Sequence, residues 1–271
     1  MKVCFVGGGN MASALIGGLL KSGVVARNLS VVEVEAAQRQ RLETRFGIAT
    51  FDDVRPAVAG SDCVVLAVKP QQVHAVAQSL GPALTGQLVL TIAAGIRTVD
   101  LGRWLRGYAR LARAMPNTPA LVGQGVAGLY AGPALEAADR ALVERILGAV
   151  GSVIWVDSEA LVDAVTAVSG SGPAYVFLLI EALEAAALDI GFDAVQARQL
   201  ALATFAGAST LAATDSEPPA TLRARVTSRG GTTERGVAAL EAGGVRAAML
   251  HAVRAAQQRA LELGEEFGRL E

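Results

Sequence analysis

Short apolar runs alternate with stretches of helical spacing through the first half of the chain. The runs that predict strands are residues 3–6, 29–34, 62–68, 88–93, 109–114, 126–130 and 152–156. The stretches that predict helices between them are residues 14–20, 38–46, 72–84, 99–105 and 135–149. Nearly continuous apolar runs are typical of strands covered on both faces. The pattern predicts an α/β fold with a doubly wound parallel sheet, right-handed crossovers and a ligand crevice at the carboxyl ends of the strands.

Strand signals end near residue 157, and the first 157 residues therefore form one predicted domain. Residues 158–271 form a second, all-helical one, with helices expected at 159–168, 173–191, 194–213, 219–226, 232–242 and 245–267. The segment 174–190 is apolar on nearly every face, which predicts a helix buried on all sides and packed in part against another subunit. Because Glu181, Glu184 and Asp189 interrupt this segment, no membrane span is expected.

Composition narrows the class of partner. The formal net charge of the 271 residues is −1, so the chain has no excess of positive charge with which to bind nucleic acid or an anionic membrane. The two cysteines, Cys4 and Cys63, lie in strand-like runs and are expected to be buried structural thiols. No spacing of Cys, His and carboxylates resembles a metal site, and no signal peptide opens the sequence, so a cytoplasmic protein is expected.

The strand 3–6 runs directly into Gly7-x-Gly9-x-x-Ala12, and a helical pattern follows. This strand–turn–helix context is what a dinucleotide-binding fingerprint requires. Gly7 permits the tight turn, Gly9 lets a pyrophosphate approach the backbone, and the small Ala12 lets helix and strand pack closely. The phosphates are expected on the free N–H groups at the start of the helix, near Asn10 and Met11.

Other polar side chains follow later strands. Lys69 ends the run 62–68, where cofactor and substrate would meet, although a solvated lysine before a helix-starting proline explains it equally well. Asn117 and Thr118 lie between two prolines in a stiff loop, which is also typical of a simple turn.

Two turns rich in Gly, Ser and Thr each precede a helix in the second domain. They span residues 169–173 and 228–233. Such turns offer N–H groups and hydroxyls to a carboxylate or phosphate, or serve only as helix caps. All three lysines lie before residue 70, and the two histidines, His74 and His251, lie in helical stretches. A hydroxyl must therefore be considered as the proton donor.

Six of these segments occur in the order seen in pyrroline-5-carboxylate reductases, and the chain resembles that family over nearly its whole length. The segments are residues 7–12, 67–70, 93–95, 115–119, 169–175 and 230–233. The resemblance implies an N-terminal Rossmann domain, a C-terminal helical dimerisation domain, and a homodimer or a dimer-based decamer. It also implies hydride transfer from a nicotinamide to the cyclic imine 1-pyrroline-5-carboxylate, giving L-proline as the last step of proline biosynthesis.

The resemblance assigns residues to each part of the site. Catalytic roles fall on Thr233, as the donor at the imine nitrogen, and on Lys69. The cofactor would contact Gly7, Gly9, Asn10, Met11, Ala12, Glu33, Ala67, Val68, Lys69, Pro70, Ala93, Ala94, Gly95 and Asn117. The substrate would contact Ser228, Gly230, Gly231, Thr232, Thr233 and Glu159, and both Glu159 and Glu217 align more loosely with the family.

Two departures from the family pattern affect specificity. Arg229 replaces the commoner proline before the two glycines, which adds a cation near the carboxylate site or loosens the turn. Glu33 lies where an acid accepts the ribose hydroxyl of NAD, and Glu35 adds a second carboxylate that would repel a 2′-phosphate. The cofactor is therefore NADPH or NADH, and Glu33 predicts use of NADH. The alternative is that Glu33 or Glu35 points into solvent and Arg39 or Arg41 reaches back.

Two other functions compete with this interpretation. A β-hydroxyacid dehydrogenase has a similar domain plan but needs a lysine on a second-domain helix, which this chain lacks. A non-catalytic NAD-sensing or scaffold protein would not need Thr233 and both glycine-rich turns. The compound that the protein oxidises distinguishes the three functions. L-proline or thioproline indicates the reductase, hydroxyacids indicate the dehydrogenase, and no oxidation indicates a sensing or scaffold protein.

Overall fold

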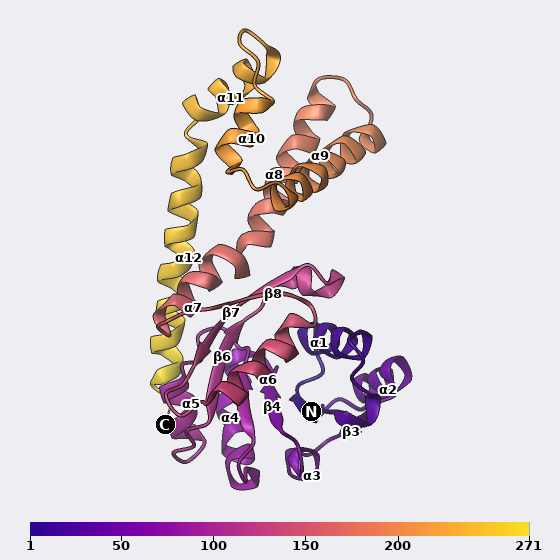
Figure 1. Cartoon of the computed structure of the whole chain (residues 1–271), viewed down its shortest axis with the longest axis vertical. Coiled ribbons are helices and arrows are strands. Elements are labelled where there is room, and N and C mark those ends of the chain that lie inside the picture. The colour runs from indigo at the N-terminus through magenta and orange to yellow at the C-terminus, as the bar shows by residue number, and fades with distance from the viewer. Residues whose placement is uncertain (271) are drawn as a thin grey trace. The chain divides into compact units, whose positions relative to one another are not determined.

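The computed structural model describes residues 1–270 and divides them into two compact units. The first comprises Met1–Ser171 with the C-terminal segment from Ala255, and the second comprises Gly172–Arg254. An eight-stranded sheet in the order β3-β2-β1-β4-β5-β6-β7-β8 forms the centre of the first unit (Figure 1). Its strands are β1 Val3–Val6, β2 Leu29–Val32, β3 Ala49–Phe51, β4 Cys63–Leu66, β5 Leu88–Thr91, β6 Leu111–Met115, β7 Gly125–Ala131 and β8 Gly151–Trp155.

Helices cover both faces of this sheet, and alternate strand residues enter two separate cores. The helices are α1 Asn10–Lys21, α2 Ala36–Phe46, α3 Val54–Val58, α4 Pro70–Leu80, α5 Thr98–Trp104, α6 Ala137–Gly148 and α7 Ala160–Val165. On β1, Val3 and Phe5 pack with α1, α2 and α6, whereas Cys4 and Val6 pack with α3, α4 and α5. Burial on both faces explains why these strands are continuous apolar runs, as predicted.

One strand–helix pair and the direction of strands β7 and β8 differ from the sequence-based prediction, since β8 runs parallel to the reversed β7. Strand β3 and helix α3 were not predicted, because β3 has only three residues and none of them is buried. Strand β7 pairs antiparallel with β6, which corrects the prediction of an entirely parallel sheet. Only the short 3₁₀ turn Thr118–Val122 joins these two strands, and a parallel connection needs a longer crossover.

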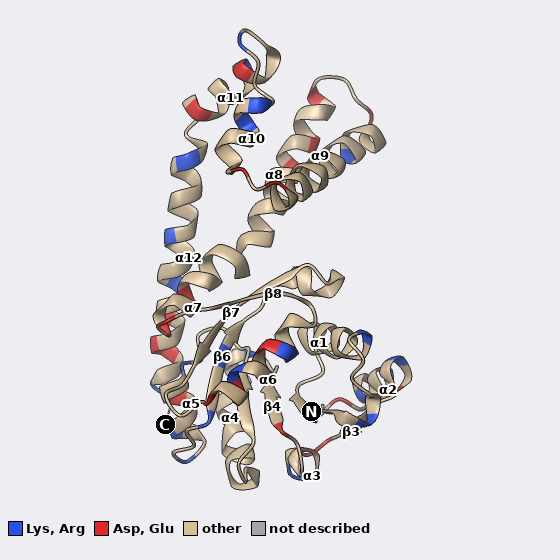
Figure 2. Cartoon of the chain, in the orientation of Figure 1, with Lys and Arg blue, Asp and Glu red and all other residues tan. Residues whose placement is uncertain are grey.

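The second unit is helical. Its elements are α8 Gly172–Asp189, α9 Ala194–Thr214, α10 Pro219–Arg225, α11 Thr232–Ala242 and the start of α12, which spans Val245–Gly268. The π-helical turn η4, Thr166–Gly170, precedes α8 in the first unit. Helix α9 contains a single charged residue, Arg198, and is otherwise tan in Figure 2.

Helix α8 is largely exposed within one chain. It was expected to be buried on all sides, yet Ala187 is its one buried residue, and Phe177 and Leu178 are 62% and 64% exposed. One chain has no second layer to cover a helix that is apolar all round, so this surface is available to another subunit. The stretch Ala160–Asp189 is also long and apolar enough to cross a membrane. The four carboxylates of this stretch therefore do not exclude a span, although one such helix is weak evidence for it.

Candidate active site

The glycine turn between β1 and α1 is open on one side and tightly packed on the other. Gly7 has a φ of +101°, and a Cβ there would lie 2.8 Å from the carbonyl oxygen of Ala67. A Cβ at Gly9 would have no atom of residues 1–270 within 4 Å. Among residues 1–270 no side chain caps the start of α1, so the first N–H groups of this helix face the open space. The turn can therefore accept a phosphate group on the Gly9 side.

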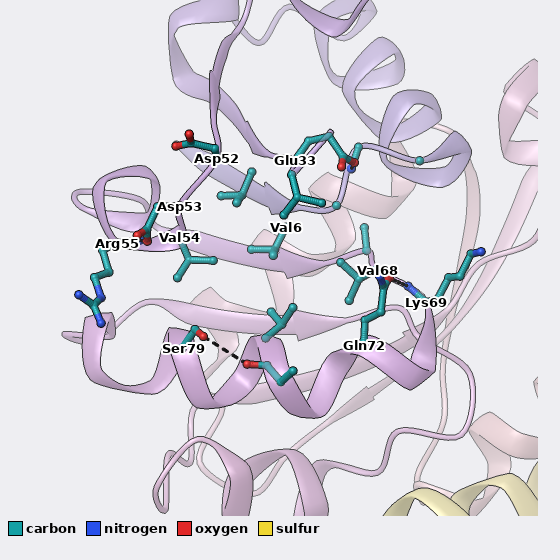
Figure 3. A pocket seen from close by; sticks show the side chains of 18 residues that line it. Val6, Glu33, Asp52, Asp53, Val54, Arg55, Val68, Lys69, Gln72 and Ser79 are labelled. Carbon is teal, nitrogen blue, oxygen red and sulfur yellow. Dashed lines mark hydrogen bonds between the residues drawn. The ribbon is translucent and has the colours of Figure 1, made fainter. Parts of the chain in front are cut away.

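Side chains from the end of β2 and the start of α2 hold the turn at Gly8. The Gly8 N–H donates to Glu33 Oε2 over 3.0 Å, and Gln38 Nε2 donates to the Gly8 carbonyl over 2.8 Å. The second oxygen of the Glu33 carboxylate accepts the N–H of Glu35 over 3.1 Å. Glu33 therefore faces the glycine turn and not solvent (Figure 3).

Arg39 reaches back to the same strand end. Its Nη1 donates to the carbonyl oxygens of Glu33 and Val34, over 2.6 and 3.0 Å. The sequence left two arrangements open here, an inward Glu33 or a returning arginine, and the structure contains both. The carboxylate of Glu33 and the guanidinium of Arg39 therefore both lie at the end of β2.

A cavity of about 630 Å³ extends from this turn along the carboxyl ends of β1, β2 and β4 (Figure 3). It is lined by Val6, Gly7, Gly8, Gly9, Val32, Glu33, Val34, Asp52, Asp53, Val54, Arg55, Ala67, Val68, Lys69, Gln72, Ala75, Val76 and Ser79. The Lys69 side chain is exposed and points away from Glu33. Asp52, Asp53 and Arg55 were missed by the sequence analysis because they belong to the unpredicted α3 region. Asp53, whose carboxylate accepts the Arg55 N–H at the start of α3, was the available signal.

A second cavity of about 300 Å³ shares Ala67 and Val68 with the first. It is lined by Met11, Ala67, Val68, Pro70, Ile92, Ala93, Ala94, Met115, Pro116, Asn117, Thr118 and Gly170. The two cavities together form one cleft along the carboxyl ends of the strands, from β2 to β6. Most of the predicted cofactor residues lie along this cleft. Asn10, Ala12 and Gly95 do not line it: Asn10 is exposed, and Ala12 and Gly95 are buried.

Asn117 lies in the second cavity with both ends of its carboxamide engaged. Its Nδ2 donates to the Ser169 carbonyl over 3.1 Å, and its Oδ1 accepts the Val126 N–H over 2.9 Å. The side chain is 8% exposed. Asn117 therefore joins β7 to the π-helical turn η4, in addition to lining the cleft.

Glu159 is engaged by residues of the first unit. Its carboxylate accepts the N–H and the hydroxyl of Thr98, over 2.6 and 2.8 Å, and lies 3.4 Å from Arg113. Arg113 is 1% exposed and also pairs with Asp163 over 2.5 Å. These contacts give Glu159 a structural role, and its predicted contact with substrate stays a prediction.

The glycine-rich turn before α11 belongs to the helical unit. Gly230 has a φ of +71°, and the Gly231 N–H donates to the Ser228 carbonyl over 3.0 Å. The Gly230 N–H donates to a carboxylate oxygen of Glu234 over 2.7 Å. Thr233 lies exposed in the first turn of the helix. The N–H groups of Gly230 and Gly231 are thus used within the turn, whereas no side chain of residues 1–270 caps the start of α11, so an anion could bind at the first N–H groups of that helix.

The two thiols take no part in the cleft. Cys4 and Cys63 are buried and free, as predicted. Burial raises the pKa of the Cys4 thiol to about 11 and also raises the pKa of Cys63. Neither thiol supplies a nucleophile at neutral pH.

Within residues 1–270 no cluster of three or more His, Cys, Asp or Glu side chains could hold a metal ion.

Two family profiles match the chain in succession. Residues 2–95 match the family described as NADP oxidoreductase coenzyme F420-dependent, and residues 159–263 match pyrroline-5-carboxylate reductase dimerisation. The first match covers the glycine turn and the second covers the turn before α11.

Similar curated proteins extend over almost the whole chain. A pyrroline-5-carboxylate reductase from Pseudomonas aeruginosa is 45% identical over 98% of this chain and 98% of its own length. One from Arabidopsis thaliana is 39% identical over 97% of this chain and 96% of its own.

Solved structures give the same result. A pyrroline-5-carboxylate reductase from Coxiella burnetii has a TM-score of 0.92 and 39% identity, covering 97% of this chain and 98% of that one. A Plasmodium falciparum pyrroline carboxylate reductase with NADP bound has a TM-score of 0.85 and 27% identity over the same shares.

Proposed function

The chain belongs to the pyrroline-5-carboxylate reductase family, and we propose from this and from the cleft geometry which residues perform the reaction. It is an NAD(P)-dependent oxidoreductase that reduces 1-pyrroline-5-carboxylate to L-proline, the last step of proline biosynthesis. The observation that carries this function is the similarity of nearly the entire chain, cleft and helical unit included, to reductases of this one name.

The cleft of the first unit fits a nicotinamide dinucleotide. The open space above Gly9 and the uncapped start of α1 suit the pyrophosphate, because a Cβ at Gly9 would project into that space. We assign the cavity beside Glu33 and Val34 to the adenosine half. The cavity beside Met11, Ala93 and Asn117 would then hold the nicotinamide half.

When bound, the reduced nicotinamide supplies a hydride to C5 of the imine. A protonated imine is already electrophilic, so the protein needs no strong base and chiefly orients the two ligands. We assign the substrate carboxylate to the N–H groups and hydroxyls of residues 228–232. Thr233 would donate a hydrogen bond at the ring nitrogen, and Arg229 would add a cation beside the carboxylate. Lys69 stays a catalytic candidate at the end of β4, and the Glu159 contact with substrate is kept as a weaker part of the proposal.

The choice between NADH and NADPH is part of the proposal. The inward carboxylate of Glu33 supports NADH, because it would repel a 2′-phosphate and accept hydrogen bonds from ribose hydroxyls. The guanidinium of Arg39 lies nearby and offsets part of that repulsion. We therefore propose that the enzyme uses NADH at least as well as NADPH.

The assembly and location complete the proposal. The dimerisation family match supports dimers, and the exposed apolar surface of α8 suits that interface. We extend this to a homodimer or a dimer-based decamer, and to a cytoplasmic protein that binds neither nucleic acid nor membrane. We also propose that residues 1–157 bind the cofactor and that residues 158–271 bind substrate and form the dimer.

The test is the oxidation of NADH and of NADPH by purified protein with 1-pyrroline-5-carboxylate, and the reverse oxidation of L-proline or thioproline at high pH. Turnover of these substrates and none of hydroxyacids supports the proposal. Hydroxyacid oxidation would indicate the dehydrogenase alternative, and cofactor binding without any turnover would indicate a sensing or scaffold protein.

A further inference from the structure

The C-terminal end of α12 packs directly on the backbone behind the second cavity. A Cβ at Gly95, whose φ is +73°, would lie 3.0 Å from Leu263 Cβ and 3.2 Å from the Phe267 ring. Gly264 faces the same segment, since a Cβ there would lie 3.8 Å from the Gly95 carbonyl oxygen. Leu263 and Phe267 thus pack closely on the Gly95 backbone and leave little room for a side chain there.

Side chains from α5 hold this end of α12 in place. Arg103 Nη2 donates to the carbonyl oxygens of Gly268 and Leu270, over 2.7 and 2.9 Å, and Trp104 Nε1 donates to Leu270 over 3.1 Å. The last carbonyls of a helix lack donors within the helix, and a cation there also opposes the negative end of its dipole. Asp100, which is 6% exposed, lies 3.4 Å from the same guanidinium and orients it.

The end of α12 packs against the residues that form the wall of the second cavity. Ala93 and Ala94 line the second cavity, while Phe267 packs against the buried cluster that contains Ala93. Residues 93–97 are therefore confined by the end of β5, the start of α5 and α12. A shift of α12 would move the surface on which the cofactor rests.

We propose that Arg103 and Trp104 clasp the end of α12 and thereby position the Ala93–Gly95 wall for the nicotinamide half of the cofactor. This inference rests on the proposed function, because it takes the second cavity as the nicotinamide end. Arg103 touches neither ligand in this arrangement and is a positioning residue. Its loss loosens α12, lets the wall move, and weakens cofactor binding.

The test compares Arg103→Leu with Arg145→Leu, which removes an exposed arginine from α6. Binding of NADH and NADPH to each protein is measured by cofactor fluorescence, beside KM for each ligand and the melting temperature. Arg103→Leu is expected to raise the cofactor Kd by about three- to thirtyfold and leave KM for the imine unchanged. Arg145→Leu is expected to change neither, and Arg103→Lys to recover part of the loss.

A spectroscopic readout separates positioning from stability alone. In a Trp155→Phe background Trp104 is the sole tryptophan, and its emission reports the clasp directly. Arg103→Leu should shift that emission and raise Kd together. A lower melting temperature with unchanged Kd overturns the proposal. If Arg103→Leu does not fold, Trp104→Phe provides the same Kd test with one bond removed. Failure of the unmodified protein to bind either cofactor would refute the proposed function itself, whereas equal Kd values among proteins that bind would refute only the clasp.

Discussion

The carboxylate of Glu33 accepts the backbone N–H of Gly8 over 3.0 Å, which joins the end of β2 to the glycine turn after β1. Gln38 binds the carbonyl of the same glycine, so both backbone groups of Gly8 are held by side chains. A Cβ at Gly8 would lie 2.5 Å from a Leu42 methyl, so a side chain at this position would require Leu42 to move. Glu33 thus holds the glycine turn in place and puts a negative charge beside it.

The first prediction concerns cofactor preference. We expect kcat/KM with NADH to equal or exceed kcat/KM with NADPH at one fixed concentration of pyrroline-5-carboxylate. A 2′-phosphate within about 4 Å of the Glu33 carboxylate would be disfavoured by about 4 kcal/mol at an effective dielectric constant near 20, before Arg39 offsets part of it. A preference above about tenfold for NADPH, or roughly 1.4 kcal/mol, would contradict this.

The variants of Glu33 separate its two roles. Glu33→Gln keeps an acceptor for the Gly8 N–H without the charge, and should move the ratio of the two kcat/KM values toward NADPH. Glu33→Ser with Val34→Arg should move it further. Glu33→Ala also removes the bond to Gly8 and should weaken both cofactors, as measured by Kd. Equal ratios in all four proteins would show that Glu33 has no part in the choice.

The second prediction concerns Thr233. Thr233→Ala is expected to lower kcat by about ten- to a thousandfold with little change in cofactor Kd, because one positioned donor is worth roughly that much in acid catalysis. Thr233→Ser retains the hydroxyl and should recover most of the rate. Stopped-flow rates of the hydride step provide the measurement. Near-normal turnover of the alanine variant would leave Thr233 with only a role in the first turn of α11.

The third prediction concerns the exposed apolar residues of α8. Phe177→Asp or Leu178→Asp should weaken dimer formation by at least about 2 kcal/mol, because a charge would be buried in an apolar interface. Sedimentation analysis over a dilution series measures the change, with Gln40→Asp on α2 as the control. Dimers of unchanged affinity in both α8 variants would exclude this face from the interface.

The fourth prediction concerns stability in acid. Burial acts to raise the pKa of the Asp139 carboxyl, but hydrogen bonds from Arg110 and from the Glu136 N–H outweigh it and hold the pKa below 3.8. A depressed pKa in the folded state contributes stability above the unfolded pKa and loses it as the pH falls through the folded value.

Asp139→Asn should therefore lower the free energy of unfolding by about 1–3 kcal/mol at pH 7, and by progressively less below about pH 4. Urea unfolding at a series of pH values measures this. Asp157→Asn, which changes an exposed carboxylate, is the control and should follow the unmodified protein. A difference between Asp139→Asn and the unmodified protein that stays constant down to pH 2 would assign the loss to packing.

The sequence by itself determined the features that depend on neighbouring residues. The apolar runs predicted seven of the eight strands, because strands buried on both faces need them. The glycine turn was also predictable from neighbouring residues, because the conformation of Gly7 and the small size of Ala12 are local requirements of a strand–turn–helix unit. The order of the six motifs then indicated the family.

The tertiary structure decided what depends on residues far apart in the chain. The bond between Glu33 and Gly8 spans 25 positions, and that between Glu159 and Thr98 spans 61. The contact of α12 with Gly95 and the antiparallel pairing of β7 likewise follow from packing. Hydrophobic spacing records which side of an element is apolar but not what covers it, so it predicted burial of α8 that one chain alone does not provide. The charge and the walls of the cleft therefore depend on contacts between residues far apart in the chain, which the local sequence pattern does not specify.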